Sequence, residues 1–182
     1  MAIVLGKRVQ ESLTRLVADE FGVSYCYFSM YILLKDMGLA GCATWMLAKS
    51  QGKTAQTVEL CDYICYRGAK IRLQPIPAPK QDWRAPLHIF EEIIRLEQKS
   101  AASLATIYEA AVADKDYPSQ HFLMQFISKQ MKREMSITKI LERLRRMQAT
   151  DIGVLTFDRE LQQMAAEENM PDVDHHNTVD FL

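Results

Sequence analysis

Four stretches of helical pattern in this sequence each carry polar side chains in the middle of an apolar stripe. The interrupting residues are Glu20, Lys53, Glu97, Gln130 and Arg133. Inward carboxylates can hold a metal cation, whereas carboxylates that face a lysine and an arginine can form buried ion pairs. Which chemistry applies depends on how the four stretches are assembled.

The elements that must position these residues are long helices. Helical periodicity without an internal proline predicts helices over about residues 7–35, 41–67, 87–113 and 119–147. Gly38 and Gly68 follow the first two as stop signals. A short fifth helix over about 154–166 is expected after Gly153, which we expect to separate it from the fourth.

The segment between the second and third helices is an extended connector, because it contains Pro75, Pro77, Pro79 and Pro86. At roughly 3 Å per residue it is long enough to run back along a helix of about 27 residues, so the second and third helices can be parallel. The sequence therefore predicts an all-α fold, a four-helix bundle with one long crossover and a short fifth helix.

Composition restricts the class of protein. With 182 residues, of which 48% are hydrophobic and 25% charged, the chain can form a single domain with a full core. We expect residues 1–166 to form that domain and residues 167–182 to be a mobile acidic tail. The net charge of -1 gives no general electrostatic reason to bind nucleic acid or a membrane. No signal peptide or membrane span is expected, so the predicted compartment is the cytoplasm.

The four cysteines are interpreted as free thiols that pack in a reducing compartment. They are Cys26, Cys42, Cys61 and Cys65, all within helical pattern. Cys61 and Cys65 share a helix face at i, i+4, so a soft-metal site is an alternative. It is the weaker one, because a second pair of ligands is missing.

In a bundle, the four inward stripes must build one core. The predicted stripes are Val9, Leu13, Leu16, Glu20, Val23, Tyr27, Met30 and Leu34; Met46, Ser50, Lys53, Thr57, Leu60 and Ile64; Leu87, Phe90, Ile94, Glu97, Ala101, Leu104 and Tyr108; and Phe122, Phe126, Gln130, Arg133, Ile137, Ile140, Leu144 and Met147. Each stripe is interrupted near mid-length, which predicts one polar layer.

The charges of that layer sum to zero. Glu20 and Glu97 face Lys53 and Arg133, with Tyr27, Gln56 and Gln130 alongside. Because an ammonium or guanidinium repels a dication, we interpret the layer as an ion-pair network in which Lys53 neutralises one acid and Arg133 the other. The alternative is that one base extends to the surface and leaves the carboxylates to hold a weak single metal.

Over roughly residues 7–165 the chain resembles the ferritin family, bacterial non-haem type. The matching segments are LVADEFGVSYCYFSM from residue 16, LEQ from 96, DKDYPSQHFL from 114, ISKQ from 127 and GVLTFDREL from 153. By resemblance, Glu20, Tyr27, Glu97 and Gln130 match the first-helix iron ligand, its neighbouring tyrosine, the third-helix glutamate and the fourth-helix glutamine.

The sequence departs from that family in the second helix. Where the family has Glu-x-x-His, this chain has Lys53-Thr54-Ala55-Gln56, so a bridging carboxylate and a histidine are absent. A further family iron site corresponds to Gly52, Lys129, Lys132 and Arg133. Animal light-chain ferritins similarly have a lysine that pairs with the third-helix glutamate, but the inner nucleating positions of light chains are Gly52, Ala55 and Val58 here.

These departures leave enzymatic activity open and favour its absence. The resemblance implies a hollow homo-oligomer of about 24 subunits that stores or buffers iron, with possible co-assembly with an active ferritin. The alternatives are a residual ferroxidase with a relocated metal site, held by Glu20, Glu97 and Gln130, or a scaffold without iron. A second weak metal site is Asp174, His175 and His176 in the tail. No haem is expected, because methionines at helical spacing usually fill cores.

Overall fold

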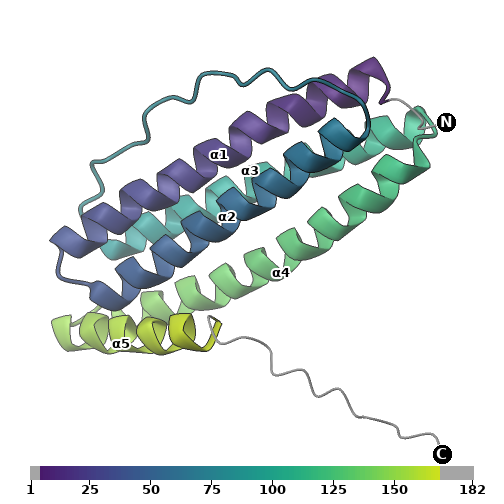
Figure 1. Ribbon diagram of the computed structural model, residues 1–182. Helices are drawn as coiled ribbons and strands as arrows, with labels where there is room; N and C mark the ends of the chain where they lie inside the picture. The colour runs from purple at the N-terminus through teal and green to yellow at the C-terminus, as the bar shows by residue number, and fades with distance from the viewer. Residues whose placement is uncertain (1–4, 169–182) are drawn as a thin grey trace, which may run out of the picture.

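The computed structural model describes residues 5–168, which form five helices and no strand (Figure 1). The helices are α1 (Lys7–Asp36), α2 (Ala40–Tyr66), α3 (Pro86–Ala113), α4 (Tyr117–Met147) and α5 (Asp151–Glu168). The predicted all-α bundle with a long crossover and a short fifth helix is confirmed, and the four long helices begin and end within two residues of their predicted bounds.

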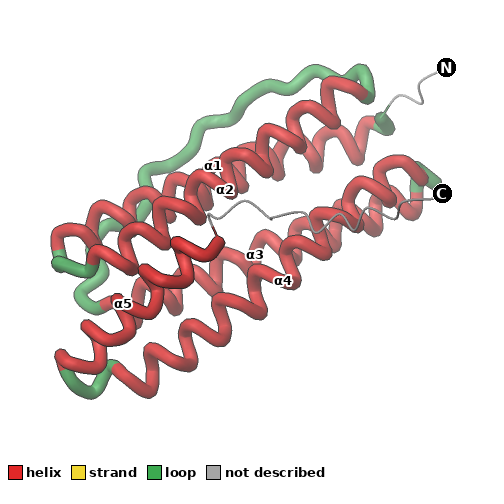
Figure 2. Tube along the Cα trace, turned by 60° about the horizontal axis from the view of Figure 1, so that its bottom comes forward, coloured by secondary structure: helices red, strands yellow, loops and turns green. Residues whose placement is uncertain are grey.

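Two antiparallel helix pairs make the bundle. α1 and α2 are joined by a tight turn, as are α3 and α4, while residues 67–85 form an extended strap that returns along the outside of the bundle (Figures 1 and 2). α3 consequently starts at the end of the bundle where α2 starts, and the two run parallel, as the length of the connector predicted. α1 packs on α2 and α3, and α3 packs on α4.

Glycines end the first two helices as expected. Gly38 has φ 76° and Gly68 has φ 75°, in the left-handed region that a residue with a Cβ enters only with strain. The amide N–H of Leu39 then donates to the carbonyl oxygen of Leu34 at 3.0 Å, and that of Ala69 donates to Ile64 at 3.1 Å. These bonds satisfy carbonyl groups that the helix leaves open at its C-terminal end.

The core consists of two apolar clusters with the polar layer between them. The cluster at the α5 end includes Trp45, Phe90 and Phe157, and the cluster at the opposite end includes Leu13 and Leu60. Trp45 and Phe90 are in ring contact at 5.7 Å between centroids, and Phe90 meets Phe157 edge to face. The apolar packing on both sides holds the backbones of the polar layer in place.

The predicted inward stripe of α3 is wrong by part of a helical turn. Ile93, Ser100 and Ile107 are buried, whereas Ile94, Ala101 and Tyr108, which the periodicity selected, are only partly buried. Both sets occur at a spacing of seven and share Phe90, Glu97 and Leu104 as neighbours, so the sequence pattern alone could not separate them. The packing of α3 between α1 and α4 decides the rotation.

The predicted start of the fifth helix is also wrong, because α5 begins at Asp151 and contains Gly153. A Cβ at Gly153 would lie 1.9 Å from the Met147 carbonyl oxygen, so glycine permits the tight connection between α4 and α5. α5 packs on α2 and α4. Glu167 and Glu168 belong to α5 rather than to a tail, and the rest of the predicted tail lies outside the described residues.

A carboxylate of α5 caps the N-terminal end of α2. Asp158 Oδ2 accepts from the Gly41 amide at 3.1 Å, and Asp158 Oδ1 accepts from the Cys42 amide at 2.7 Å. A carboxylate at this position satisfies open N–H groups and interacts favourably with the helix dipole. Burial, together with the Asp158 carboxylate, raises the pKa of the Cys42 thiol far above its usual range, so Cys42 stays a neutral thiol.

The cysteine prediction holds for only part of the set. Cys42 is buried and Cys26 and Cys61 are partly buried, but Cys65 is exposed, so the packing interpretation is wrong for Cys65. Across residues 5–168, no helix combines the length and apolar character that a membrane span requires.

Candidate functional site

Side chains from all four long helices meet at mid-length in the bundle. The seven residues that the sequence singled out there are Glu20 and Tyr27 on α1, Lys53 and Gln56 on α2, Glu97 on α3, and Gln130 and Arg133 on α4. Six of them are buried, and Arg133 is partly exposed. Direct hydrogen bonds and ion pairs connect all seven into one network.

Lys53 lies at the centre of the network and contacts both acids. Its Nζ is 2.6 Å from Glu20 Oε2 and 3.1 Å from Glu97 Oε2. The Lys53 side chain is 1% exposed, so it does not extend to solvent. Helix α2 can place an ammonium here because the residues at the same level of α1 and α3 are carboxylates, which offset the cost of desolvating it.

Glu97 is the main acceptor of the network. Its Oε1 accepts from the Tyr27 hydroxyl at 2.7 Å, and its Oε2 accepts from Gln130 Nε2 at 2.8 Å. The Gln130 amide nitrogen also lies 2.8 Å from the Glu97 backbone carbonyl oxygen, and this second contact fixes the orientation of the amide. α1, α3 and α4 are thus joined through one carboxylate.

The surroundings of Glu97 determine its protonation state. Burial acts to raise the pKa of this carboxyl, but Lys53, Arg133 and the hydrogen bonds from Tyr27 and Gln130 outweigh burial and leave the pKa below its usual value. Burial, the Glu97 charge and the hydrogen bond to Glu97 raise the pKa of Tyr27 well above its usual value. At neutral pH the pair is therefore a carboxylate and a neutral phenol that donates to it.

Arg133 pairs with Glu97 and Lys53 makes its shortest contact with Glu20, as the sequence expectation of one base for each acid allows, but Lys53 also contacts Glu97. Arg133 Nη2 donates to Gln56 Oε1 at 2.6 Å, and its Nη1 donates to Gln130 Oε1 at 2.9 Å. Its one ion pair in the layer is with Glu97 Oε2, at 3.5 Å. Two bases therefore converge on Glu97, while Glu20 has Lys53 alone.

Glu20 is left with an unsatisfied acceptor. Its Oε1 is buried and has no hydrogen-bond partner among the described residues. Such an atom is unusual, because buried carboxylate oxygens nearly always have donors. Residue spacing does not predict this asymmetry, since Glu20 and Glu97 occupy equivalent places in their stripes.

One neighbour of the network was missed at the sequence level. Glu134 Oε1 lies 3.4 Å from Gln130 Nε2, at the partly buried edge of the layer. Its position four residues after Gln130 places it on the same side of α4, and that spacing was the available signal.

A second buried polar cluster was also missed and lies where α2 and α4 meet at the other end of the bundle. Arg67 Nη2 lies 3.0 Å from Asp116 Oδ1, and Asp116 accepts from the Ser119 hydroxyl at 2.7 Å. Its members anchor the turn before α4, and we interpret the cluster as structural.

The donor set of the central layer does not fit a pair of iron ions. Within residues 5–168 no three His, Cys, Asp or Glu side chains are grouped as metal ligands require. The Lys53 ammonium contacts both carboxylates at hydrogen-bond distance, so a cation between them would meet a positive charge in the same space. The predicted tail ligands Asp174, His175 and His176 lie outside the described residues.

Comparison with known proteins identifies relatives over most of the chain. The family model for the ferritin-like domain matches residues 10–147. A bacterial non-heme ferritin from Bacteroides fragilis is 27% identical over 160 residues, covering 88% of this chain and 99% of the relative. One from Staphylococcus haemolyticus is 24% identical over 165 residues, covering 91% and 99%.

Solved structures give the same result. An open-pore ferritin from the archaeon Archaeoglobus fulgidus superposes with a TM-score of 0.86 at 27% identity, covering 89% of this chain and 98% of that chain. A humanized archaeal ferritin gives a TM-score of 0.85 at 28% identity, covering 87% and 96%. The family model covers most of the chain, and the superpositions extend over nearly the same length. The chain belongs to the ferritin family.

Proposed function

We propose that this chain is a subunit of a hollow ferritin-type homo-oligomer that stores or buffers iron without oxidising it at the centre of the bundle. The observation that supports this most directly is the position of Lys53 Nζ, 2.6 Å from Glu20 and 3.1 Å from Glu97. The ammonium supplies the positive charge that the two carboxylates need. Iron is then the cargo of the assembly, and its oxidation occurs elsewhere, in solution or on a co-assembled active ferritin in the cytoplasm.

The hydrogen bonds around Glu97 support a fixed network rather than a site that a metal could open. Displacing Lys53 would leave a buried ammonium without its partners, which typically costs about 3–5 kcal/mol. Tyr27 and Gln130 would at the same time lose their acceptor or share it with the metal. A metal would have to offset both losses in order to bind.

One observation favours a second candidate, a residual ferroxidase with a relocated metal. Glu20 Oε1 is a buried carboxylate oxygen without a hydrogen-bond partner among the described residues. A single cation held there, away from Lys53, would satisfy it. Glu97 and Gln130 are committed to the network on their own side, so this candidate would rest mainly on one carboxylate.

Ferrous oxidation by the assembled protein separates the two candidates. We expect the rate at which ferric absorbance appears under air to equal the protein-free background. A variant with Lys53→Glu and Gln56→His, which places Glu-x-x-His in α2, is expected to exceed that background, and Lys49→Glu on the same helix serves as the matched control. Oxidation by the unmodified chain above background would overturn the first candidate.

Storage itself is tested on particles purified without added iron. We expect particle-bound iron by elemental mass spectrometry, and a hollow assembly by electron microscopy. The particles could contain no iron and also retain none when added ferrous iron is oxidised chemically in their presence. That result would contradict storage and favour the scaffold without iron. A monomer or dimer in solution at micromolar concentration would contradict the shell.

A further inference from the structure

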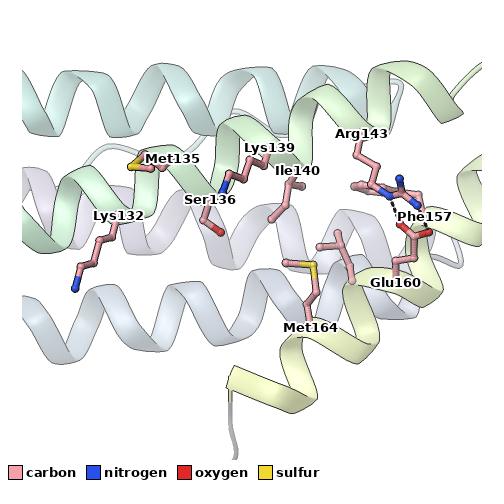
Figure 3. A pocket seen from close by; sticks show the side chains of 10 residues that line it. Lys132, Met135, Ser136, Lys139, Ile140, Arg143, Phe157, Glu160 and Met164 are labelled. Atoms are coloured by element: carbon pink, nitrogen blue, oxygen red, sulfur yellow. Dashed lines mark hydrogen bonds and ion pairs between the residues drawn. The ribbon is translucent and has the colours of Figure 1, made fainter.

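A groove of about 340 Å³ lies between α4 and α5 (Figure 3). Ile140, Phe157 and Leu161 line it with apolar surface, and Met135 and Met164 lie at its edges. The exposed fractions of the two methionines are 59% and 36%, high for residues of this type. Figure 3 shows the two helices close together at Arg143 and Glu160 and further apart toward Lys132 and Met164, where the groove opens.

The rim of this groove is positively charged. Lys132, Lys139 and Arg143 line it from α4, and Glu160 is its one acidic lining residue. Glu160 is already paired, since its Oε1 accepts from Arg143 Nη2 at 2.6 Å. Lys132 and Lys139 have no ion pair with any described residue, so two cationic side chains stand beside exposed apolar surface without an anionic partner.

The chain that follows α5 has the complementary composition. Residues 169–182 contain no lysine or arginine, and their acidic residues are Asp172, Asp174 and Asp180. The same segment carries apolar side chains next to these charges, namely Val173, Val179, Phe181 and Leu182. The segment starts one helical turn beyond Met164, at the open end of the groove, and at roughly 3.3 Å per residue it can extend about 45 Å, more than the length of α5.

We propose that residues 169–182 fold back into the groove between α4 and α5 of their own chain. Apolar side chains of the segment, Phe181 in particular, cover the apolar surface beside Met135 and Met164. The aspartates then face Lys132 and Lys139 on the rim. Docking buries a methionine surface that the helices leave open, and it does not depend on whether the assembly stores iron.

Hydrogen exchange of the full chain, followed by mass spectrometry, tests the docking. We expect the amides of residues 173–181 to exchange at least about tenfold more slowly than those of a synthetic peptide of residues 169–182. The double variant Lys132→Glu, Lys139→Glu should return them to the peptide rate. Lys70→Glu, Lys99→Glu is the matched control, because it reverses two exposed lysines outside the groove, and it should retain the protection.

Phe181→Ser provides a second variant that changes no residue of the described helices. It should also abolish the protection, while the amides of α1 to α4 exchange as in the unmodified chain. Exchange of the segment at the peptide rate in the unmodified chain overturns the proposal. Protection that survives both Lys132→Glu, Lys139→Glu and Phe181→Ser overturns it as well, since the segment would then be held elsewhere.

Carbodiimide coupling of carboxylates to lysines identifies which chain supplies the segment. Under the proposal, peptide mapping finds Asp172, Asp174 or Asp180 joined to Lys132 or Lys139 in protein that runs as a single chain on a denaturing gel. The same link found only in a band with the mass of two cross-linked chains would mean that a second copy supplies the segment. That result would overturn docking within one chain.

Discussion

Lys53 Nζ lies 2.6 Å from Glu20 Oε2, and both side chains are buried in the centre of the bundle. The same nitrogen lies 3.1 Å from Glu97 Oε2, so one ammonium joins carboxylates from two different helices. Because each group is removed from water, the free energy of each depends on the presence of the others. The stability of the layer should therefore respond sharply to changes of charge.

Replacing Lys53 by methionine should lower the free energy of unfolding by about 3–5 kcal/mol, because Glu20 and Glu97 then share one buried space with only Arg133 to offset them. Denaturant unfolding at a fixed protomer concentration measures the change. Lys99→Met is the control on an exposed side chain and should change stability by less than about 0.5 kcal/mol.

The double variant Lys53→Met, Glu20→Gln removes one charge of each sign. It should recover part of the loss, since the carboxylate that Lys53 alone neutralised is gone. A Lys53→Met protein that unfolds at the same denaturant concentration as the unmodified chain would rule out the buried pairing.

Glu97→Gln should cost more stability than Glu20→Gln, by about 2 kcal/mol. In either orientation, an amide at position 97 turns its NH₂ group toward a present donor, the Tyr27 hydroxyl on one side or the Gln130 amide on the other. An amide at position 20 can direct its NH₂ to the side where Oε1 has no partner and keep its oxygen toward Lys53. Parallel unfolding curves for the two variants measure the difference, and equal losses would contradict the asymmetry.

The lowered pKa of Glu97 predicts how the stability of the layer changes with acid. A carboxyl with a folded pKa below its unfolded value of about 4.3 stabilises the fold above that value, and this contribution disappears as the pH falls through the folded pKa. The difference in unfolding free energy between the unmodified chain and Glu97→Gln should be largest above about pH 5 and should decrease toward pH 3. A constant difference over this range would exclude Glu97 as its source.

Gly41→Ala should loosen the contact between α5 and α2, because a Cβ at position 41 would lie 1.9 Å from the Asp158 carbonyl oxygen. Separation of the helices would also break the Asp158 bonds to the Gly41 and Cys42 amides. The Cys42 thiol, buried beneath this contact, should then react faster with a thiol reagent under native conditions.

Gly52→Ala is the matched control on the same helix. No side chain or distant backbone atom lies within 4 Å of a Cβ at Gly52, so alanine should stabilise α2 by about 0.5–1 kcal/mol and leave Cys42 unreactive. If Gly41→Ala reacted no faster than Gly52→Ala, the close approach of α5 would not be needed to protect Cys42.

The periodicity of the sequence was sufficient to predict the long helices, the crossover and the residues of the polar layer, because apolar spacing, prolines and glycines act locally. It placed the α3 stripe wrongly, since Ile93 and Ile94 fit the same pattern equally well. It also missed the Asp158 cap, because a contact across more than a hundred residues leaves no local signal.

By itself the sequence determined that a balanced set of acids, bases and amides would meet inside an all-α bundle, because every inward stripe is interrupted at the same level. Only the tertiary structure decided how these groups pair. Lys53 joins both carboxylates, Arg133 contacts Glu97, Gln56 and Gln130, and one oxygen of Glu20 has no donor among the described residues. The reason is geometric, because pairing depends on helix rotation and rotamer over distances of about 3 Å, which residue spacing does not encode.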